Sequence, residues 1–487
     1  MKLNKAILLV FIALLLTIQS KAQDAPIFTS DFTPEEFSQR REKVYDAIGP
    51  NSIAIIQGET APRGYVKFRQ TNEFYYLTGV EVAGAYLLLD GSSRRATLYL
   101  PHRNAGRERG EGKVLSAEDG EFLMGTIGFD AVYGPEYISE NLGRLTRRNT
   151  SLITYTPFSP PEGAVESRDL AMRFQTDILS DPWDGRTSRH GHFMNLLTDR
   201  FPEIQLKNLT PILDQLRLIK SEAELKLIRK ATRLSSLGLM ESMRSTVPGM
   251  KEYELDAVSK YIFTRNGGQG DAYYSLIASS INAYFPHYHQ GARTMLDGDF
   301  LLMDYAPDYG YYMSDITRMW PVNGKFSNDQ RDLYGFYLAC YKSILYNIKP
   351  YKTAKEVGAV AIKEMEEHLA KATFSKDIYK KAAENFVANY KRGNESRSTL
   401  GHFVGMATHD VGRLDGQYLP GMVFTIEPAL RVPEEMIYIR LEDLIIIGEN
   451  GAEIVSEFAP MDIDGIEKLM KEKGMSQVYP REKVPKN

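Results

Sequence analysis

The stretch that most constrains the fold is a predicted β-hairpin over residues 300–318. An apolar run ends in Asp304, a turn signal follows at Tyr309-Gly310, and the returning run carries Asp315. If Tyr309-Gly310 is the two-residue turn, Asp304 lies directly opposite Asp315, with the two Cβ atoms roughly 5 Å apart on one face. Two carboxylates at that distance repel each other unless a proton or a cation lies between them.

A second predicted hairpin, over residues 423–442, repeats this arrangement. A turn centred on Glu434-Glu435 places Glu427 opposite Glu442, and the phrase Gly401-His402-Phe403 supplies an imidazole between the two hairpins. Four carboxylates and one histidine on otherwise apolar strands are costly to bury without a counter-charge. The sequence therefore predicts a site for two divalent cations.

The length and composition of the chain limit the other possibilities. A chain of 487 residues is too long for one ordinary core, so we expect two domains. Its 43% hydrophobic and 25% charged residues are typical of a soluble globular protein, and a formal charge of −4 gives no basic field for nucleic acid. The single cysteine, Cys340, has no partner for an internal disulfide, and its apolar neighbours indicate a core thiol.

Residues 1–22 have the pattern of a cleaved secretory signal peptide. Lys2 and Lys5 precede a 13-residue, mainly apolar run (6–18), and small residues flank Lys21 at the expected cleavage site. An uncleaved membrane anchor is the alternative, but the run is short of the roughly 20 residues that a span needs. We therefore expect a secreted or periplasmic protein with no stable membrane insertion after signal removal.

Residues 23–207 are predicted to form an α/β domain with a connecting segment. We expect helices over 31–48, 117–128 and 135–145, and strands at 52–57, 74–77, 85–90, 96–100 and 151–155. Residues 158–189 are rich in Pro, Ser, Asp and Gly, which is typical of a segment that connects or decorates a domain.

Residues 208–487 are predicted to form an α+β domain that carries the candidate site. Ser221 and Glu224 have the spacing of a capping box, at the start of a helix that runs through Met243. Further helices are expected over 252–266, 328–349 and 354–372, and strands at 274–278, 300–305, 312–318, 423–427 and 436–442. The two hairpin-plus-helix halves, each with one carboxylate pair, suggest pseudo-two-fold symmetry from an ancient duplication.

Several motifs together resemble a known family. The sequence around Asp304 and Asp315, Gly401-His402-Phe403, Thr425-Ile-Glu427-Pro and Ile439-Arg-Leu-Glu442 resemble the five-ligand set of the "pita-bread" metallopeptidases, which include methionine aminopeptidase, prolidase and aminopeptidase P. The phrases at 69–79 and 320–326 are similar to aminopeptidase P in particular. The resemblance implies an N-terminal α/β domain of the creatinase and aminopeptidase P type, followed by a pita-bread catalytic domain.

The resemblance also implies a role for each candidate residue. Asp304 is then a ligand of one metal, Asp315 and Glu442 bridge both metals, and His402 and Glu427 bind the second. Mostly oxygen ligands with one imidazole suit Mn²⁺, with Zn²⁺, Co²⁺ or Fe²⁺ as alternatives.

Three residues are expected to take part in catalysis beyond metal binding. A metal-activated hydroxide would attack the scissile carbonyl. Glu427 would carry the proton of the water, and His287 and His409 would lie beside the substrate, with His289 as the alternative to His287.

The expected activity is removal of the N-terminal residue from peptides with proline in second position. Prolidase-like hydrolysis of Xaa-Pro dipeptides and a broader aminopeptidase are the alternatives, because Ser398 stands where many of these enzymes carry a histidine that helps to wall the proline pocket. A non-catalytic peptide-binding relative would lack metal ligands, and none of the five is missing. We expect a peptide substrate, no nucleic-acid partner, and a homo-oligomer, either a dimer or a tetramer.

Overall fold

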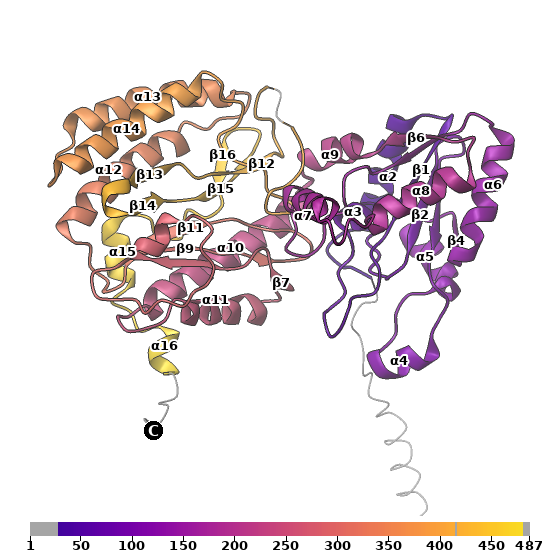
Figure 1. Ribbon diagram of the computed structural model, residues 1–487, viewed down its shortest axis with the longest axis horizontal. Coiled ribbons are helices and arrows are strands. Elements are labelled where there is room, and N and C mark those ends of the chain that lie inside the picture. Colours follow the sequence, from indigo (N-terminus) through magenta and orange to yellow (C-terminus); the bar gives the residue numbers. More distant parts are fainter. Residues whose placement is uncertain (1–27, 414–415, 481–487) are drawn as a thin grey trace, which may run out of the picture.

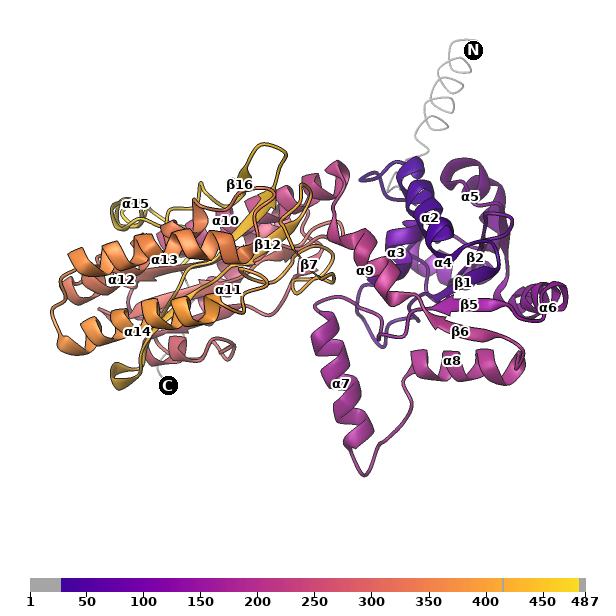
Figure 2. The ribbon, with the colours of Figure 1, turned by 90° about the horizontal axis from the view of Figure 1, so that it is seen from above.

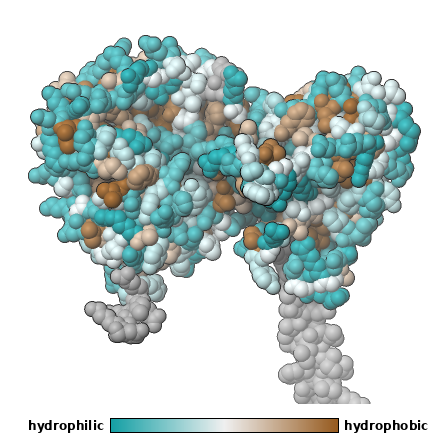
Figure 3. Space-filling model, viewed as in Figure 1, coloured by the Kyte–Doolittle hydropathy of each residue, from teal (hydrophilic) through white to brown (hydrophobic). Residues whose placement is uncertain are grey.

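The computed structural model describes residues 28–413 and 416–480, which form two bodies side by side (Figure 1). The predicted signal peptide at 1–22 lies outside the described residues. None of the described helices is both long and apolar enough to span a bilayer. The space-filling view shows a largely hydrophilic face with a notch where the two bodies meet (Figure 3).

The N-terminal body is built on one mixed six-stranded sheet with the order β4-β3-β2-β1-β5-β6. Its strands are β1 (Ser52–Gln57), β2 (Tyr86–Asp90), β3 (Arg95–Tyr99), β4 (Ala131–Tyr133), β5 (Ile153–Thr156) and β6 (Gln205–Asn208). Strands β1, β2 and β3 pair antiparallel, whereas β3–β4, β1–β5 and β5–β6 pair parallel. Five of the six residues of β1 are buried, as expected for a central strand with both faces covered.

The same part of the chain contains helices and short 3-10 turns. They are α2 (Pro34–Ile48), α3 (Asn72–Thr78), α4 (Ala105–Glu111), η1 (Ala117–Asp119), α5 (Gly120–Ile127), η2 (Pro135–Tyr137), α6 (Ile138–Arg148), α7 (Arg168–Ser180), α8 (Arg189–Arg200) and α9 (Thr210–Leu218). The predicted elements are found in the expected order, with one exception. The predicted boundary between residues 207 and 208 falls at the end of β6 and remains a prediction.

The exception is the aromatic run at 74–77, which was predicted as a strand and is part of helix α3. All seven residues of α3 are buried, and a short run of continuous burial has no periodicity that separates a strand from a helix. Gly79 follows α3 at φ 64°, the left-handed conformation in which many helices end.

The C-terminal body contains most of the long helices (Figure 2). They are α10 (Glu222–Ser245), α11 (Tyr253–Arg265), α12 (Asn328–Leu345), α13 (Ala354–Lys371), α14 (Asp377–Asn394), α15 (Ile463–Leu469) and α16 (Met475–Val478). The capping box of Ser221 and Glu224 is confirmed at the start of α10. Helix α14 was not predicted. Cys340 is buried in α12, and burial raises the pKa of its thiol to about 12, as expected for a core thiol.

Two three-stranded antiparallel sheets, one from each half, form the centre of this body. The first has the order β11-β9-β8 and the second β12-β15-β16, with short ribbons β10-β7 and β13-β14 beside them. The elements are β7 (Gly270–Asp271), β8 (Leu276–Ser279), η3 (Ser280–Tyr284), β9 (Phe300–Asp304), β10 (Pro307–Asp308), β11 (Thr317–Pro321), β12 (Val423–Ile426), β13 (Ala429–Val432), η4 (Pro433–Glu435), β14 (Ile437–Arg440), β15 (Asp443–Ile447) and β16 (Ala452–Ile454).

The register predicted for the first hairpin is wrong by one residue at the turn. Tyr309 pairs with Tyr312, so Gly310 and Tyr311 are the central turn residues, at φ 60° and 72°. Asp304 consequently lies opposite Thr317, not opposite Asp315. The offset between the two carboxylates is two residues, which keeps them on the same face because side chains alternate with a period of two.

This turn gives a prediction about stability. Gly310→Ala should lower the free energy of unfolding by about 1–2 kcal/mol, because a side chain in the left-handed region is strained and its Cβ would lie 3.1 Å from Asp31. Gly335→Ala is the matched control, since Gly335 lies within α12 and its added Cβ would meet no atom within 4 Å. Thermal unfolding of both variants tests this, and equal midpoints would contradict it.

The register of the second hairpin is confirmed. Ala429 pairs with Arg440 and Val432 with Ile437, the ladder that a turn centred between Glu434 and Glu435 requires. The two hairpins are joined by reciprocal backbone hydrogen bonds between Thr317 and Glu442, at 3.3 and 3.1 Å. This bridge brings the acidic ends of both hairpins to one place.

Candidate metal centre

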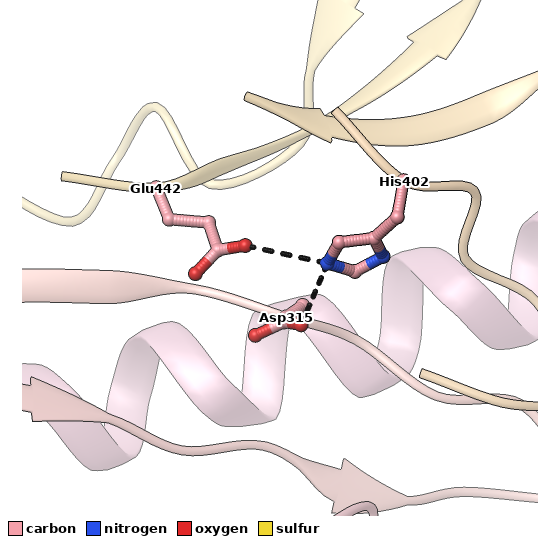
Figure 4. Close-up of side chains that lie close together, drawn as sticks. All are labelled: Asp315, His402 and Glu442. Atoms are coloured by element: carbon pink, nitrogen blue, oxygen red, sulfur yellow. Dashed lines mark ion pairs between the residues drawn. The ribbon is translucent and has the colours of Figure 1, made fainter. Parts of the chain in front are cut away.

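Three of the predicted ligands meet at the junction between the two sheets (Figure 4). Asp315 precedes β11, Glu442 lies between β14 and β15, and His402 lies between α14 and β12. Nε2 of His402 is 3.5 Å from Oδ2 of Asp315 and 3.8 Å from Oε1 of Glu442. One ligand atom from each of the three lies within 4.8 Å of the other two, which is the spacing of groups that can share a metal ion.

The other two predicted ligands belong to the same cluster. Oε1 of Glu427 is 3.6 Å from Nε2 of His402, and its side chain is about one third exposed. Asp304 is buried and is linked to the cluster through Tyr273 and Arg440. All five side chains therefore converge on one region.

Tyr273 is a member of the cluster that the sequence did not indicate. Its hydroxyl lies 2.5 Å from Oδ1 of Asp304 and 2.6 Å from Oδ1 of Asp315. Burial, followed by the charges of Asp304 and Asp315, raises the pKa of Tyr273 well above its usual range. The neutral hydroxyl has one proton to donate, so it holds the two carboxylates side by side without neutralising them.

Arg440 contacts two carboxylates of this cluster with its guanidinium. Its guanidinium donates from Nη1 to Oε2 of Glu427 at 3.2 Å and from Nη2 to Asp304, and Nη2 also donates to the hydroxyl of Thr317 at 3.1 Å. Arg440 therefore orients one carboxylate from each hairpin.

The charges of the cluster favour additional cations. Burial, and then repulsion from Asp304, raises the pKa of Asp315 to about 7, and burial followed by the Asp315 charge raises the pKa of Glu442 well above its usual range. Burial acts to lower the pKa of His402, but its contacts with Asp315 and Glu442 outweigh this and raise that pKa well above the usual value. Without a metal, the cluster must therefore retain protons that an isolated carboxylate would lose near neutral pH.

One buried oxygen of the cluster has no hydrogen-bond partner within the part of the chain that the structure describes. It is Oε1 of Glu442, the atom that faces His402. A buried carboxylate oxygen without a donor is costly unless a cation binds it. Together with the carboxylate and imidazole donors around it, this oxygen fits a divalent metal site.

His409 lies beside the cluster, on the side of the N-terminal body. Its ring centroid is 4.3 Å from that of His402, and its Nδ1 is 3.3 Å from Oδ2 of Asp169 in α7. Burial, followed by the charge on His402, lowers the pKa of His409. The contact with Asp169 had no signal in the sequence, because 240 residues separate the two positions.

The structure does not bring His287 into contact with the cluster. His287 is exposed on the loop 285–290, and among the described residues its ring has no hydrogen bond or ion pair with the carboxylates. His289, the alternative, is also exposed and packs its ring against Tyr274 with 4.5 Å between centroids. Ser398 is exposed as well.

Comparison with known proteins agrees with this geometry. Residues 226–449 match metallopeptidase family M24, and residues 37–154 match the aminopeptidase P N-terminal domain. The Xaa-Pro aminopeptidase of Haemophilus influenzae is 28% identical over 454 residues, which cover 90% of this chain and 97% of that protein. The Xaa-Pro dipeptidase of Rattus norvegicus is 26% identical over 476 residues, covering 87% and 90% of the two chains.

A solved structure extends this likeness to the whole fold. Aminopeptidase P from Escherichia coli, determined with the inhibitor Pro-Leu, gives a TM-score of 0.71 at 26% identity and covers 91% of this chain and 99% of that one. The fold and the acidic cluster thus define a pita-bread metallopeptidase, a metal-dependent peptide hydrolase. Within that class the chain belongs to the aminopeptidase P family, and the fold class predicted from the sequence is confirmed.

Proposed function

We propose that this protein is an Xaa-Pro aminopeptidase that works with two divalent metal ions, Mn²⁺ being the best match to its donors. The observation that carries the proposal is the convergence of Asp315, His402 and Glu442, in which the carboxylate oxygen of Glu442 that faces the imidazole accepts no hydrogen bond from the described residues. Identity near 28% to an Xaa-Pro aminopeptidase over almost the whole chain supports the substrate class.

In this proposal the five residues divide the metal-binding work between the two hairpins. Asp304 and Asp315 come from the first hairpin and Glu427 and Glu442 from the second, while His402 adds the imidazole. Asp315 and Glu442 would each hold both ions. Two bound ions supply a water of lowered pKa and a Lewis acid for the scissile carbonyl.

Proton transfer and contact with the substrate are assigned to side chains at the edge of the cluster. Glu427 is the most exposed of the four carboxylates, which suits a group that takes a proton from the attacking water and passes it to the leaving nitrogen. His409 borders the cluster and is proposed to donate to the carbonyl oxygen of the substrate. His287, on the exposed loop 285–290, is the second histidine proposed to face the substrate.

A dipeptidase is the second candidate. Two observations favour it: Ser398 stands at a position where a histidine would restrict the pocket, and the chain resembles an Xaa-Pro dipeptidase over most of its length. We further propose export through the signal at residues 1–22, and a homo-oligomer, either a dimer or a tetramer.

Hydrolysis of three peptides by Mn²⁺-reconstituted protein separates these candidates. We expect cleavage of Ala-Pro-Ala to alanine and Pro-Ala, with at least about 10-fold slower cleavage of Ala-Ala-Ala, because the pocket must favour the proline ring. Preferential cleavage of Gly-Pro would favour the dipeptidase. Protein that binds these peptides, retains no metal and cleaves none of them would contradict the enzymatic proposal.

A further inference from the structure

Residues 158–189, predicted from their composition to connect or decorate a domain, reach the edge of the metal centre. Helix α7 lies in this segment and stands between the two bodies (Figure 2). The residue before α7 and the second residue of α7 both contact His409. The backbone N–H of His409 donates to Oγ of Ser167 at 3.2 Å, and Nδ1 of its ring lies 3.3 Å from Oδ2 of Asp169.

We propose that Asp169 is a positioning residue for His409, supplied to the catalytic centre by the N-terminal body. This inference rests on the proposed function, in which His409 faces the substrate. A carboxylate that accepts from Nδ1 fixes the rotation of an imidazole and leaves Nε2 as the nitrogen available to the substrate.

The backbone around Asp169 is held firmly enough for that role. Arg168 is mostly buried, and its Nη1 donates to both oxygens of Asp214 at 2.7 Å, while its Nη2 is 2.9 Å from Oε1 of Glu162. Ser167 precedes α7 but does not cap it with its side chain, so its hydroxyl is used for His409. An exposed ion pair usually loses side-chain entropy when its two groups are held in one geometry. This loss is smaller for Asp169 because the residues on either side of it are already fixed.

The residue after His409 is fixed by the same buried network. Oδ1 of Asp410 is 2.6 Å from Nη2 of Arg217, and Oδ2 is 3.0 Å from Nζ of Lys220. The same Arg217 nitrogen is 2.7 Å from Glu162, which also contacts Arg168. The backbone on both sides of the Asp169–His409 contact is thus held by one set of buried ion pairs.

Asp169 and His409 are themselves partly exposed, with side-chain exposures of 57% and 45%. A surface contact of this kind adds little to folding stability. Its loss should therefore appear in the rate of catalysis and not in the melting temperature, which separates a positioning role from a structural one.

Kinetics of Asp169→Ala test the proposal. We expect kcat for Ala-Pro-Ala to fall about 10-fold with KM and metal content unchanged, and Asp169→Asn, which keeps an acceptor oxygen, to retain more of the rate. Asp177→Ala, two turns further along the exposed part of α7, is the matched control and should match the wild type. A wild-type rate in Asp169→Ala would overturn the inference.

A double-mutant cycle with His409 shows whether the effect acts through that ring. In a His409→Ala background, Asp169→Ala should cause no further loss, since the ring it positions is absent. An equal loss in both backgrounds would show that Asp169 acts elsewhere and would overturn the proposal.

Crystal structures provide a readout that does not depend on the substrate. In Asp169→Ala the His409 ring should rotate or occupy more than one orientation, whereas an unchanged single orientation would contradict the inference. If the wild-type enzyme does not cleave Xaa-Pro peptides, the proposed function fails, and these structures still decide the role of Asp169.

Discussion

Replacing Asp315 with alanine is expected to abolish peptide hydrolysis, with a loss in kcat/KM of at least about 1,000-fold. Asp315 lies at the centre of the cluster, where its Oδ2 is 3.5 Å from Nε2 of His402 and its Oδ1 accepts a hydrogen bond from the Tyr273 hydroxyl. In the proposed assignment Asp315 binds both ions. Its removal should therefore remove both metals. Metal analysis and hydrolysis of Ala-Pro-Ala measure the two effects, and Glu442→Ala should behave in the same way.

The stability of the metal-free protein separates this loss from misfolding. Burial and the charge of Asp304 raise the pKa of Asp315, so the carboxylate destabilises the metal-free fold when it ionises. Metal-free Asp315→Ala should consequently melt no lower than the metal-free wild type at pH 8. His409→Ala is the contrasting variant, since it should retain metal and lose rate. Full activity in Asp315→Ala would show that the bridging assignment is wrong.

Replacing Arg318 with methionine is expected to lower the free energy of unfolding by about 3–5 kcal/mol. Arg318 and Asp443 are fully buried, and Nη2 of Arg318 is 2.6 Å from Oδ1 of Asp443. Nη1 also donates to the backbone oxygen of Glu442 at 2.8 Å. Among the residues that the structure describes, the variant would leave Asp443 with the hydroxyls of Tyr341 and Ser456 as its side-chain donors. It would also loosen the segment between β14 and β15 that carries Glu442.

The midpoint of thermal unfolding at pH 7 measures this effect. Arg144→Met is the control, because Arg144 is exposed on α6 and its ion pair with Glu140 should be worth no more than about 0.5 kcal/mol. Adding Asp443→Leu to Arg318→Met should recover part of the loss, since no unpaired charge is then buried. Equal midpoints for Arg318→Met and Arg144→Met would contradict the importance of this buried pair.

The candidate site was largely predictable because the types of its residues and their spacing in the sequence indicate its chemistry. An apolar strand that ends in a carboxylate is rare enough to draw attention, and a second such pair with an intervening histidine leaves a metal as the simplest counter-charge. The register of the second hairpin followed from a turn between Glu434 and Glu435, which the ladder from Ala429 to Arg440 confirms. For this hairpin, the position of the turn alone was enough to predict which residues pair.

Other features depend on contacts that no local pattern contains. Tyr273 reaches Asp304 and Asp315 only because β8 and β9 pair, and Asp169 reaches His409 only because the two bodies lie against each other. A tyrosine or an aspartate in such positions resembles any other polar residue near a helix or strand end.

The sequence by itself determined the order of most of the elements, the residue types of the candidate ligands and one hairpin register, since these follow from periodicity, turn residues and charge. The register of the first hairpin, over residues 300–318, was decided only by the tertiary structure. Tyr311 takes a left-handed conformation because its ring stacks on Tyr75 at 3.5 Å, lies under Arg69, and its hydroxyl donates to Glu81 at 2.7 Å. Those partners belong to the N-terminal body, so contacts more than 200 residues away in sequence set the turn that positions Asp315.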